Sequence, residues 1–203
     1  MTRDDIAKVL EAALMASDRP LSLDALRRLF DEPAPARDEL RAALEGLREA
    51  YAERAVELVE VASGYRFQVR RPWAARVARL WEEKPQRYSR ALLETLALIA
   101  YRQPITRGEI EEIRGVAVSS QIMRTLLERG WVRVVGHREV PGRPALYATT
   151  RAFLDHFGLA RLEELPPLPE VKDLEQLEAR LAEVASTGDV APKTLEEAQD
   201  AAV

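Results

Sequence analysis

The chain has 203 residues, of which 47% are hydrophobic and 32% charged, a composition typical of a globular protein that can bury a core. It contains no cysteine, which excludes disulfides, thiolate metal sites and cysteine nucleophiles and fits a reducing cytoplasm. The N-terminus lacks the pattern of a secretory signal, and no apolar run approaches the roughly 18 residues that span a bilayer. We therefore expect a cytoplasmic protein without a membrane segment.

The net charge of −4 conceals an uneven distribution. Residues 170–203 carry nine acidic and three basic side chains, whereas residues 86–169 carry nine acidic and twelve basic ones. Residues 1–85 are nearly balanced, with sixteen acidic and fifteen basic side chains. A protein dedicated to nucleic-acid binding usually has a strong basic footprint, which this chain lacks.

Three helices are expected in the first part of the chain. Apolar residues recur at helical spacing over 6–14, after Thr2 as a candidate N-cap. Ser22 is a candidate N-cap for a short helix whose apolar residues are Leu23, Leu26, Leu29 and Phe30. A third helix places four apolar side chains on one face, namely those of Leu40, Leu44, Leu47 and Tyr51.

A hairpin and a fourth helix follow. β-Branched residues over 56–61, a Ser-Gly turn and alternating polarity over 65–69 predict two paired strands. A helix is expected to begin near Pro72. Its apolar face is too large to lie bare on a domain of 85 residues, so we predict a homodimer held through the first domain. The candidate dimer-interface residues are Trp73, Val77, Leu80 and Trp81.

The same order of elements repeats in the second half at a constant offset of 84 residues. Pro20-Leu21-Ser22 corresponds to Pro104-Ile105-Thr106, Leu26 to Ile110 and Leu29 to Ile113. Ser89, Thr106 and Thr150 are candidate N-caps, and Gly115, Gly130 and Gly158 are candidate helix ends. A period that covers breaker, cap and core positions indicates one supersecondary unit used twice.

We predict a mainly α fold with small β-hairpins, built as two tandem winged-helix domains over 1–84 and 88–168. A C-terminal helix and a disordered acidic tail are expected over 169–203. The helix carries a narrow apolar stripe at Leu174, Leu177, Leu181 and Val184. Such a stripe is typical of a surface that packs on another helix or on the protein's own body.

A search for catalytic chemistry finds no matching pattern. The glycines are scattered, so the sequence offers no phosphate-binding loop. The only histidines, His137 and His156, lie nineteen residues apart without a metal-ligand partner motif. We therefore predict no catalytic residue, no cofactor and no metal, although a Ser-His-Asp triad is not excluded by residue order alone.

The second domain could instead read DNA, because its third helix and loop carry suitable side chains. These are Ser119, Ser120, Gln121 and Arg124 on the helix, with His137, Arg138 and Arg143 in the loop. The matching helix of the first domain interleaves arginines with acidic residues and would repel a phosphate backbone. A helix-turn-helix that serves as a protein-binding scaffold is favoured, and a winged-helix transcriptional regulator is the alternative.

Several motifs in residues 89–169 resemble those of one known family. In chain order they are Glu94-Thr95-Leu96-Ala97-Leu98-Ile99-Ala100-Tyr101 with Gln103-Pro104-Ile105-Thr106, Leu126-Leu127-Glu128-Arg129-Gly130, Pro141-Gly142-Arg143-Pro144 with Leu146-Tyr147, Phe153-Leu154 with Phe157-Gly158-Leu159, and Leu165-Pro166-Pro167-Leu168. The family is bacterial segregation and condensation protein B, the kleisin-associated subunit of the chromosome-organising SMC complex. The first 85 residues match this family in layout rather than in motif.

The resemblance implies a non-catalytic, nucleoid-associated subunit without a cofactor. It would bind itself and the kleisin ScpA, and reach the SMC ATPase through the kleisin. Candidate partner contacts are Arg143, Pro144, Tyr147, Leu174, Leu177 and Leu181. His137 stands where the resemblance predicts arginine, which weakens any DNA role of the loop, so weak or no direct DNA binding is expected.

Overall fold

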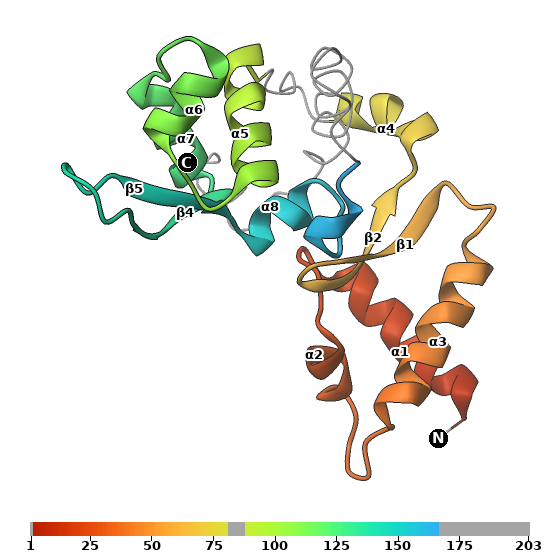
Figure 1. Ribbon diagram of the computed structural model, residues 1–203. Helices are drawn as coiled ribbons and strands as arrows, with labels where there is room; N and C mark the ends of the chain where they lie inside the picture. The colour runs from red at the N-terminus through yellow and green to blue at the C-terminus, as the bar shows by residue number, and fades with distance from the viewer. Residues whose placement is uncertain (1, 81–87, 167–203) are drawn as a thin grey trace, which may run out of the picture. The chain divides into compact units, whose positions relative to one another are not determined.

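The computed structural model describes residues 2–80 and 88–166 (Figure 1), and these two stretches belong to two compact units. Trp81 of the predicted dimer face lies outside the described residues. So do the predicted apolar stripe and acidic tail, over 169–203.

The first unit contains helices, one hairpin and a final short helical turn. Its elements are α1 (Arg3–Ala16), α2 (Leu23–Arg27), α3 (Arg37–Ala50), β1 (Val56–Val61), β2 (Gly64–Val69), α4 (Arg71–Val77) and η1 (Ala78–Leu80). Thr2 caps α1 in a capping box with Asp5, and Ser22 caps α2, as the sequence predicted. Helices α1 and α3 pack side by side and supply most of the core, together with Leu26 and Leu58.

Strands β1 and β2 are antiparallel, with Val56 opposite Val69. Leu21, which precedes α2, adds an isolated bridge to Tyr65, and their backbone groups exchange two hydrogen bonds of 2.9 Å. Gly64 has a φ of 140°, and a Cβ at this position would lie 2.1 Å from the Leu21 carbonyl oxygen. Only glycine fits here, because both the dihedral angle and the close approach exclude a side chain.

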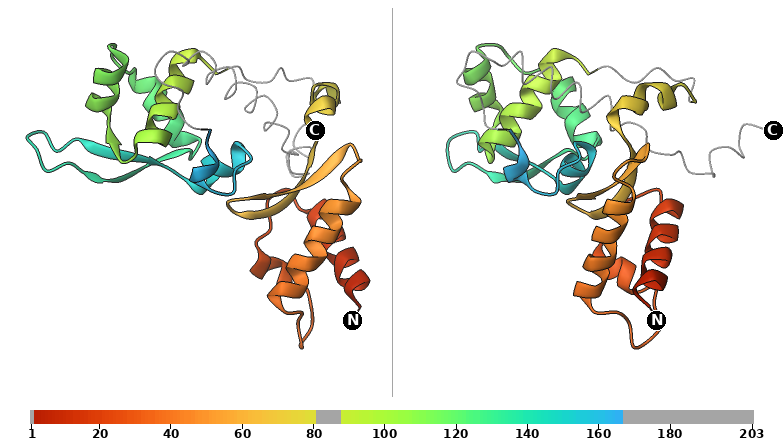
Figure 2. Two further views of the ribbon diagram at one scale, coloured as in Figure 1. Left: turned by 45° about the vertical axis from the view of Figure 1, so that its right-hand side comes forward. Right: turned by 90° about the vertical axis from the view of Figure 1, so that its right-hand side faces the viewer.

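The second unit contains the same order of elements with a longer hairpin. Its elements are α5 (Arg90–Arg102), β3 (Ile105–Thr106), α6 (Arg107–Arg114), α7 (Ser120–Glu128), β4 (Val132–His137), β5 (Ala145–Thr149), α8 (Arg151–His156) and η2 (Leu162–Glu164). The sheet order is β3-β5-β4, so β4 is an edge strand. Figure 1 and the left view of Figure 2 show the β4–β5 hairpin extending beyond the helices of its unit.

Residues 84 positions apart occupy equivalent places in the two units. Leu21 and Ile105 both pair with the second strand of a hairpin, at Tyr65 and Tyr147. Ser22 and Thr106 both cap the following helix, and the core residues Leu26 and Ile110 are each 0% exposed. The two-residue strand β3 was not predicted from the sequence.

Two core positions were predicted wrongly. Leu29 and Ile113 are 50% and 53% exposed, because α2 and α6 are short and each has one fully buried residue, Leu26 or Ile110. In α7 Met123 is buried, while Leu127 is 40% exposed. The core of the second unit is centred on α5, with Trp131, Phe153 and Phe157 packed against it.

Candidate partner-binding surfaces

Acidic side chains of α6 accept hydrogen bonds that fix the geometry of helices α6 and α7. Glu109 and Thr106 form the predicted capping box at the start of α6, and Gly115 ends this helix with a φ of 69°. Glu111 accepts hydrogen bonds from the Val118 backbone N–H at 2.9 Å and from Arg107 Nε at 3.0 Å. The Val118 hydrogen bond, followed by Arg107, lowers the pKa of Glu111 below its usual range.

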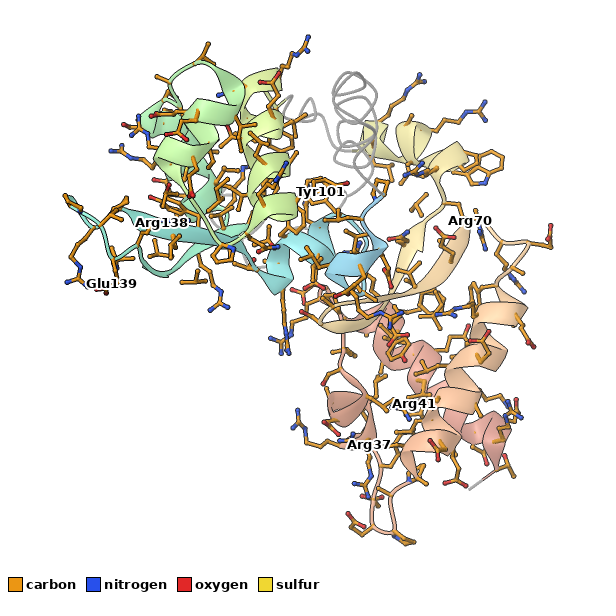
Figure 3. All side chains as sticks on the ribbon, viewed as in Figure 1. Arg37, Arg41, Arg70, Tyr101, Arg138 and Glu139 are labelled. Carbon is orange, nitrogen blue, oxygen red and sulfur yellow. The ribbon has the colours of Figure 1, made fainter. Side chains whose placement is uncertain are left out.

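An ion pair links the β4–β5 hairpin to helix α6. Arg138 Nη2 lies 2.7 Å from Glu109 Oε1 and 3.0 Å from Oε2. Hydrogen bonds from Thr106, and then the charge of Arg138, lower the pKa of Glu109. Figure 3 labels Arg138 and its neighbour Glu139 on the hairpin. Arg138 therefore orients the hairpin and is not a free cation.

The loop between β4 and β5 is a stiff turn. Gly142 and Arg143 have positive φ angles of 85° and 40°, and the Arg143 N–H donates to the Val140 carbonyl at 2.9 Å. The Arg143 side chain is 72% exposed, 3.7 Å from Glu139. Pro144 and Tyr147 are half-buried. Of these three candidate partner contacts, Arg143 alone is exposed.

Two of the predicted DNA-reading residues on α7 have structural roles within the protein. Ser119 is the N-cap of α7, and Ser120 Oγ lies 3.4 Å from Arg107 Nη1. The basic side chains of α7 are limited to Arg124. A helix with one cation offers few phosphate contacts.

The second unit instead exposes apolar side chains on the same elements. They are Ile113 and Val116 at the end of α6, Leu127 on α7, Val134 and Val135 on β4, and Val140 in the loop, each 40–56% exposed. Sequence reasoning did not select these residues. Their exposure depends on which neighbouring elements cover them, and the local sequence does not signal this.

The candidate dimer face lies in the first unit on α4 and η1. Ala74 is the buried residue of α4. Trp73 and Leu80 are 44% and 77% exposed, and Val77 is half-buried. The Arg76 guanidinium lies 5.8 Å from the Trp73 ring centroid, so one ring face has a cation nearby.

No group of three or more His, Asp or Glu side chains is placed to hold a metal within residues 2–80 and 88–166. A helix long and apolar enough to cross a bilayer is also absent from these stretches.

Comparison with known proteins decides the family. The model of the family "Segregation and condensation complex subunit ScpB" matches residues 8–168, which is most of the chain. The chain belongs to the ScpB family. The match includes both units, so the first unit is part of the family pattern although its motifs were not recognised in the sequence.

Individual ScpB relatives agree with this assignment. The segregation and condensation protein B homolog of Coxiella burnetii is 61% identical over 176 residues, covering 86% of this chain and 84% of the relative. The Moorella thermoacetica protein is 45% identical, covering 83% and 85%. A crystal structure of ScpB from Mycobacterium tuberculosis is 34% identical, covers 78% of this chain and 98% of its own, and has a TM-score of 0.36.

Proposed function

We propose that this chain is a non-catalytic subunit of the bacterial SMC–kleisin complex, acting at the nucleoid in chromosome condensation and segregation. It binds the kleisin ScpA as a homodimer and reaches the SMC ATPase through the kleisin. The observation that carries the protein-binding role is the group of exposed apolar side chains on α6, α7 and the β4–β5 hairpin. Exposed apolar side chains on these elements favour contact with another protein, because a DNA reader would present cations at these positions.

The order of elements in each unit supports a winged-helix assignment. A helix is followed by a short pairing segment, two further helices and a hairpin. In the second unit the hairpin is braced on α6 through Arg138 and Glu109. We therefore assign 1–84 and 88–168 as two winged-helix domains used as scaffolds. A DNA-binding regulator is the alternative, and the pairing of Arg138 disfavours it.

The self-association surface is assigned to the first domain. Trp73 and Leu80 expose more apolar surface than the rest of α4 and η1, and Val77 lies between them in sequence. The partner contacts at Leu174, Leu177 and Leu181 lie outside the described residues and remain a prediction from sequence.

A pull-down with the tagged full-length chain from a lysate of its own cells tests the proposal. We expect the kleisin and the SMC ATPase to be recovered together. Ile113→Asp with Val116→Asp should reduce recovery at least tenfold, because both changes place charge on the apolar surface. Met15→Asp, at a 51% exposed apolar position in the first unit, is the matched control and should leave recovery unchanged. Recovery of DNA without a kleisin would overturn the proposal.

A further inference from the structure

A hollow of about 520 Å³ lies in the second unit beside β4, α8 and η2. Its apolar lining comes from Leu154 and Leu162, both half-buried, and its rim carries Arg133 and Arg151, both exposed. The lining of the hollow contains none of the exposed apolar residues of α6, α7 and the β4–β5 hairpin. The segment proposed below to occupy it includes Leu174 and Leu177, so for these two leucines it is an alternative to a partner contact.

The polar groups in the floor of the hollow are already satisfied. Gln103 Oε1 accepts hydrogen bonds from the Thr149 N–H at 2.7 Å and from Thr149 Oγ1 at 3.0 Å. The Thr150 hydroxyl donates to the Gly130 carbonyl and accepts from the Phe153 N–H. Recognition of a ligand therefore falls to the two arginines and the two leucines.

The arginines are available for a carboxylate. In the part of the chain that the structure describes, neither Arg133 nor Arg151 forms a hydrogen bond or ion pair through its side chain, whereas Arg107, Arg114 and Arg138 are each paired with a glutamate. Two guanidinium groups beside apolar side chains match a segment in which acidic and apolar residues alternate.

We propose that this hollow binds residues 170–178 of the chain's own C-terminal segment. This stretch reads EVKDLEQLE, with acidic groups at Glu170, Asp173, Glu175 and Glu178 and apolar groups at Val171, Leu174 and Leu177. Its chemistry complements the hollow in both charge and polarity.

This segment follows the hollow closely in the sequence. Pro166 follows Leu162 by four residues, and its carbonyl accepts a hydrogen bond of 2.5 Å from the hydroxyl of Tyr101, labelled in Figure 3. Four to twelve further residues span up to roughly 14 to 40 Å when extended, so the segment reaches a site on the same unit. Exposed ion pairs are individually weak, but a short tether raises the effective concentration of the segment to about the millimolar range.

A spin label tests the proposal in the full-length chain. Because the protein has no cysteine, Ala179→Cys provides a single attachment site for a nitroxide. We expect the label to broaden the ¹⁵N-amide signals of Arg133, Thr149 and Leu154. Arg133→Glu with Arg151→Glu should remove most of this broadening, and so should Asp173→Lys with Glu175→Lys. Combining the two pairs should restore it, because the charges are exchanged.

The matched control is Arg124→Glu with Arg143→Glu, which makes the same charge change away from the hollow and should leave the broadening intact. Dispersed amide spectra show that each variant is folded. Broadening that is identical in the native and Arg133/Arg151 proteins would reflect the tether alone and would overturn the proposal. A mixture of ¹⁵N-labelled chains without a nitroxide and nitroxide-bearing chains without ¹⁵N tests for binding between copies. Broadening in this mixture would assign the segment to a second copy and would also overturn the proposal.

Discussion

Gly64 illustrates how a single residue supports the pairing of two distant segments. We expect Gly64→Ala to destabilise the protein by about 1–3 kcal/mol from backbone strain alone, with a further loss from the clash with Leu21. The φ of 140° and the 2.1 Å approach to the Leu21 carbonyl oxygen are the physical causes. Urea unfolding of the two proteins measures the difference.

The matched control for this prediction is Gly46→Ala, in the middle of α3. The nearest atom to a new Cβ there is Arg3 Nη2 at 3.9 Å, an ordinary contact. Alanine should therefore stabilise the helix by about 0.5–1 kcal/mol. Equal losses from both substitutions would show that the close approach of Gly64 to Leu21 does not constrain this position.

Glu109 and Glu111 make the second unit sensitive to acid. Both side chains have a pKa below the usual value of 4.5, because each accepts a backbone hydrogen bond and faces an arginine. A carboxyl group with a lowered pKa stabilises the fold above its unfolded pKa, and this stability is lost as pH falls through the folded value. The second unit should therefore lose stability as the pH falls from about 4.5.

Glutamine substitutions at these two positions test the origin of this acid sensitivity. Glu109→Gln and Glu111→Gln should lower the thermal midpoint at pH 7, and this effect should shrink as the pH falls below about 4.5 and the native carboxyl groups become protonated. Glu112→Gln is the control, because the Glu112 side chain is exposed and makes no hydrogen bond in the described part of the chain. A constant difference between pH 7 and pH 3 would contradict an ionic origin.

At the scale of elements, local signals were predictable and contacts between elements were not. The N-caps at Thr2 and Thr106 were predicted because the side chain and its backbone partner lie three residues apart. The pairing of Arg138 with Glu109 joins residues 29 positions apart, and nothing in the local sequence signals it. Ser119 was interpreted as a DNA contact because its role as the cap of α7 depends on where that helix begins.

The candidate partner-binding surface of the second unit was predictable only in part. The loop with Arg143 carries a recognisable turn motif, and its stiff geometry is present. The exposed valines of β4 could not be recognised, because a run of β-branched residues looks the same in a buried strand and in an edge strand. Edge status depends on β3, whose two residues are too few to give a periodic signal.

The α4–η1 face leads to a prediction about self-association. We expect Trp73→Asp with Leu80→Asp to convert a dimer into a monomer, because both side chains are exposed and apolar. Sedimentation velocity at micromolar concentration measures the change in mass. Leu29→Asp, at a similarly exposed position in the same unit, should leave the dimer intact. A native chain that sediments as a monomer would refute this interface.

For the whole molecule, the distribution of charge predicts weak binding to DNA. The net charge is −4, and α7 carries one arginine. Few phosphate contacts predict micromolar or weaker affinity for DNA with little sequence preference. Most of this affinity should be lost at physiological salt. Fluorescence anisotropy with random and genomic duplexes measures this. A tight, sequence-selective site that survives in about 150 mM salt would favour the transcriptional regulator instead.

Multi-angle light scattering on the full-length chain mixed with its purified kleisin shows whether this protein is a dimeric, kleisin-binding subunit. We predict one species whose mass is at least that of two 22.9 kDa chains plus one kleisin. Two separate peaks, each with the mass of its free component, would show that the chain does not bind the kleisin.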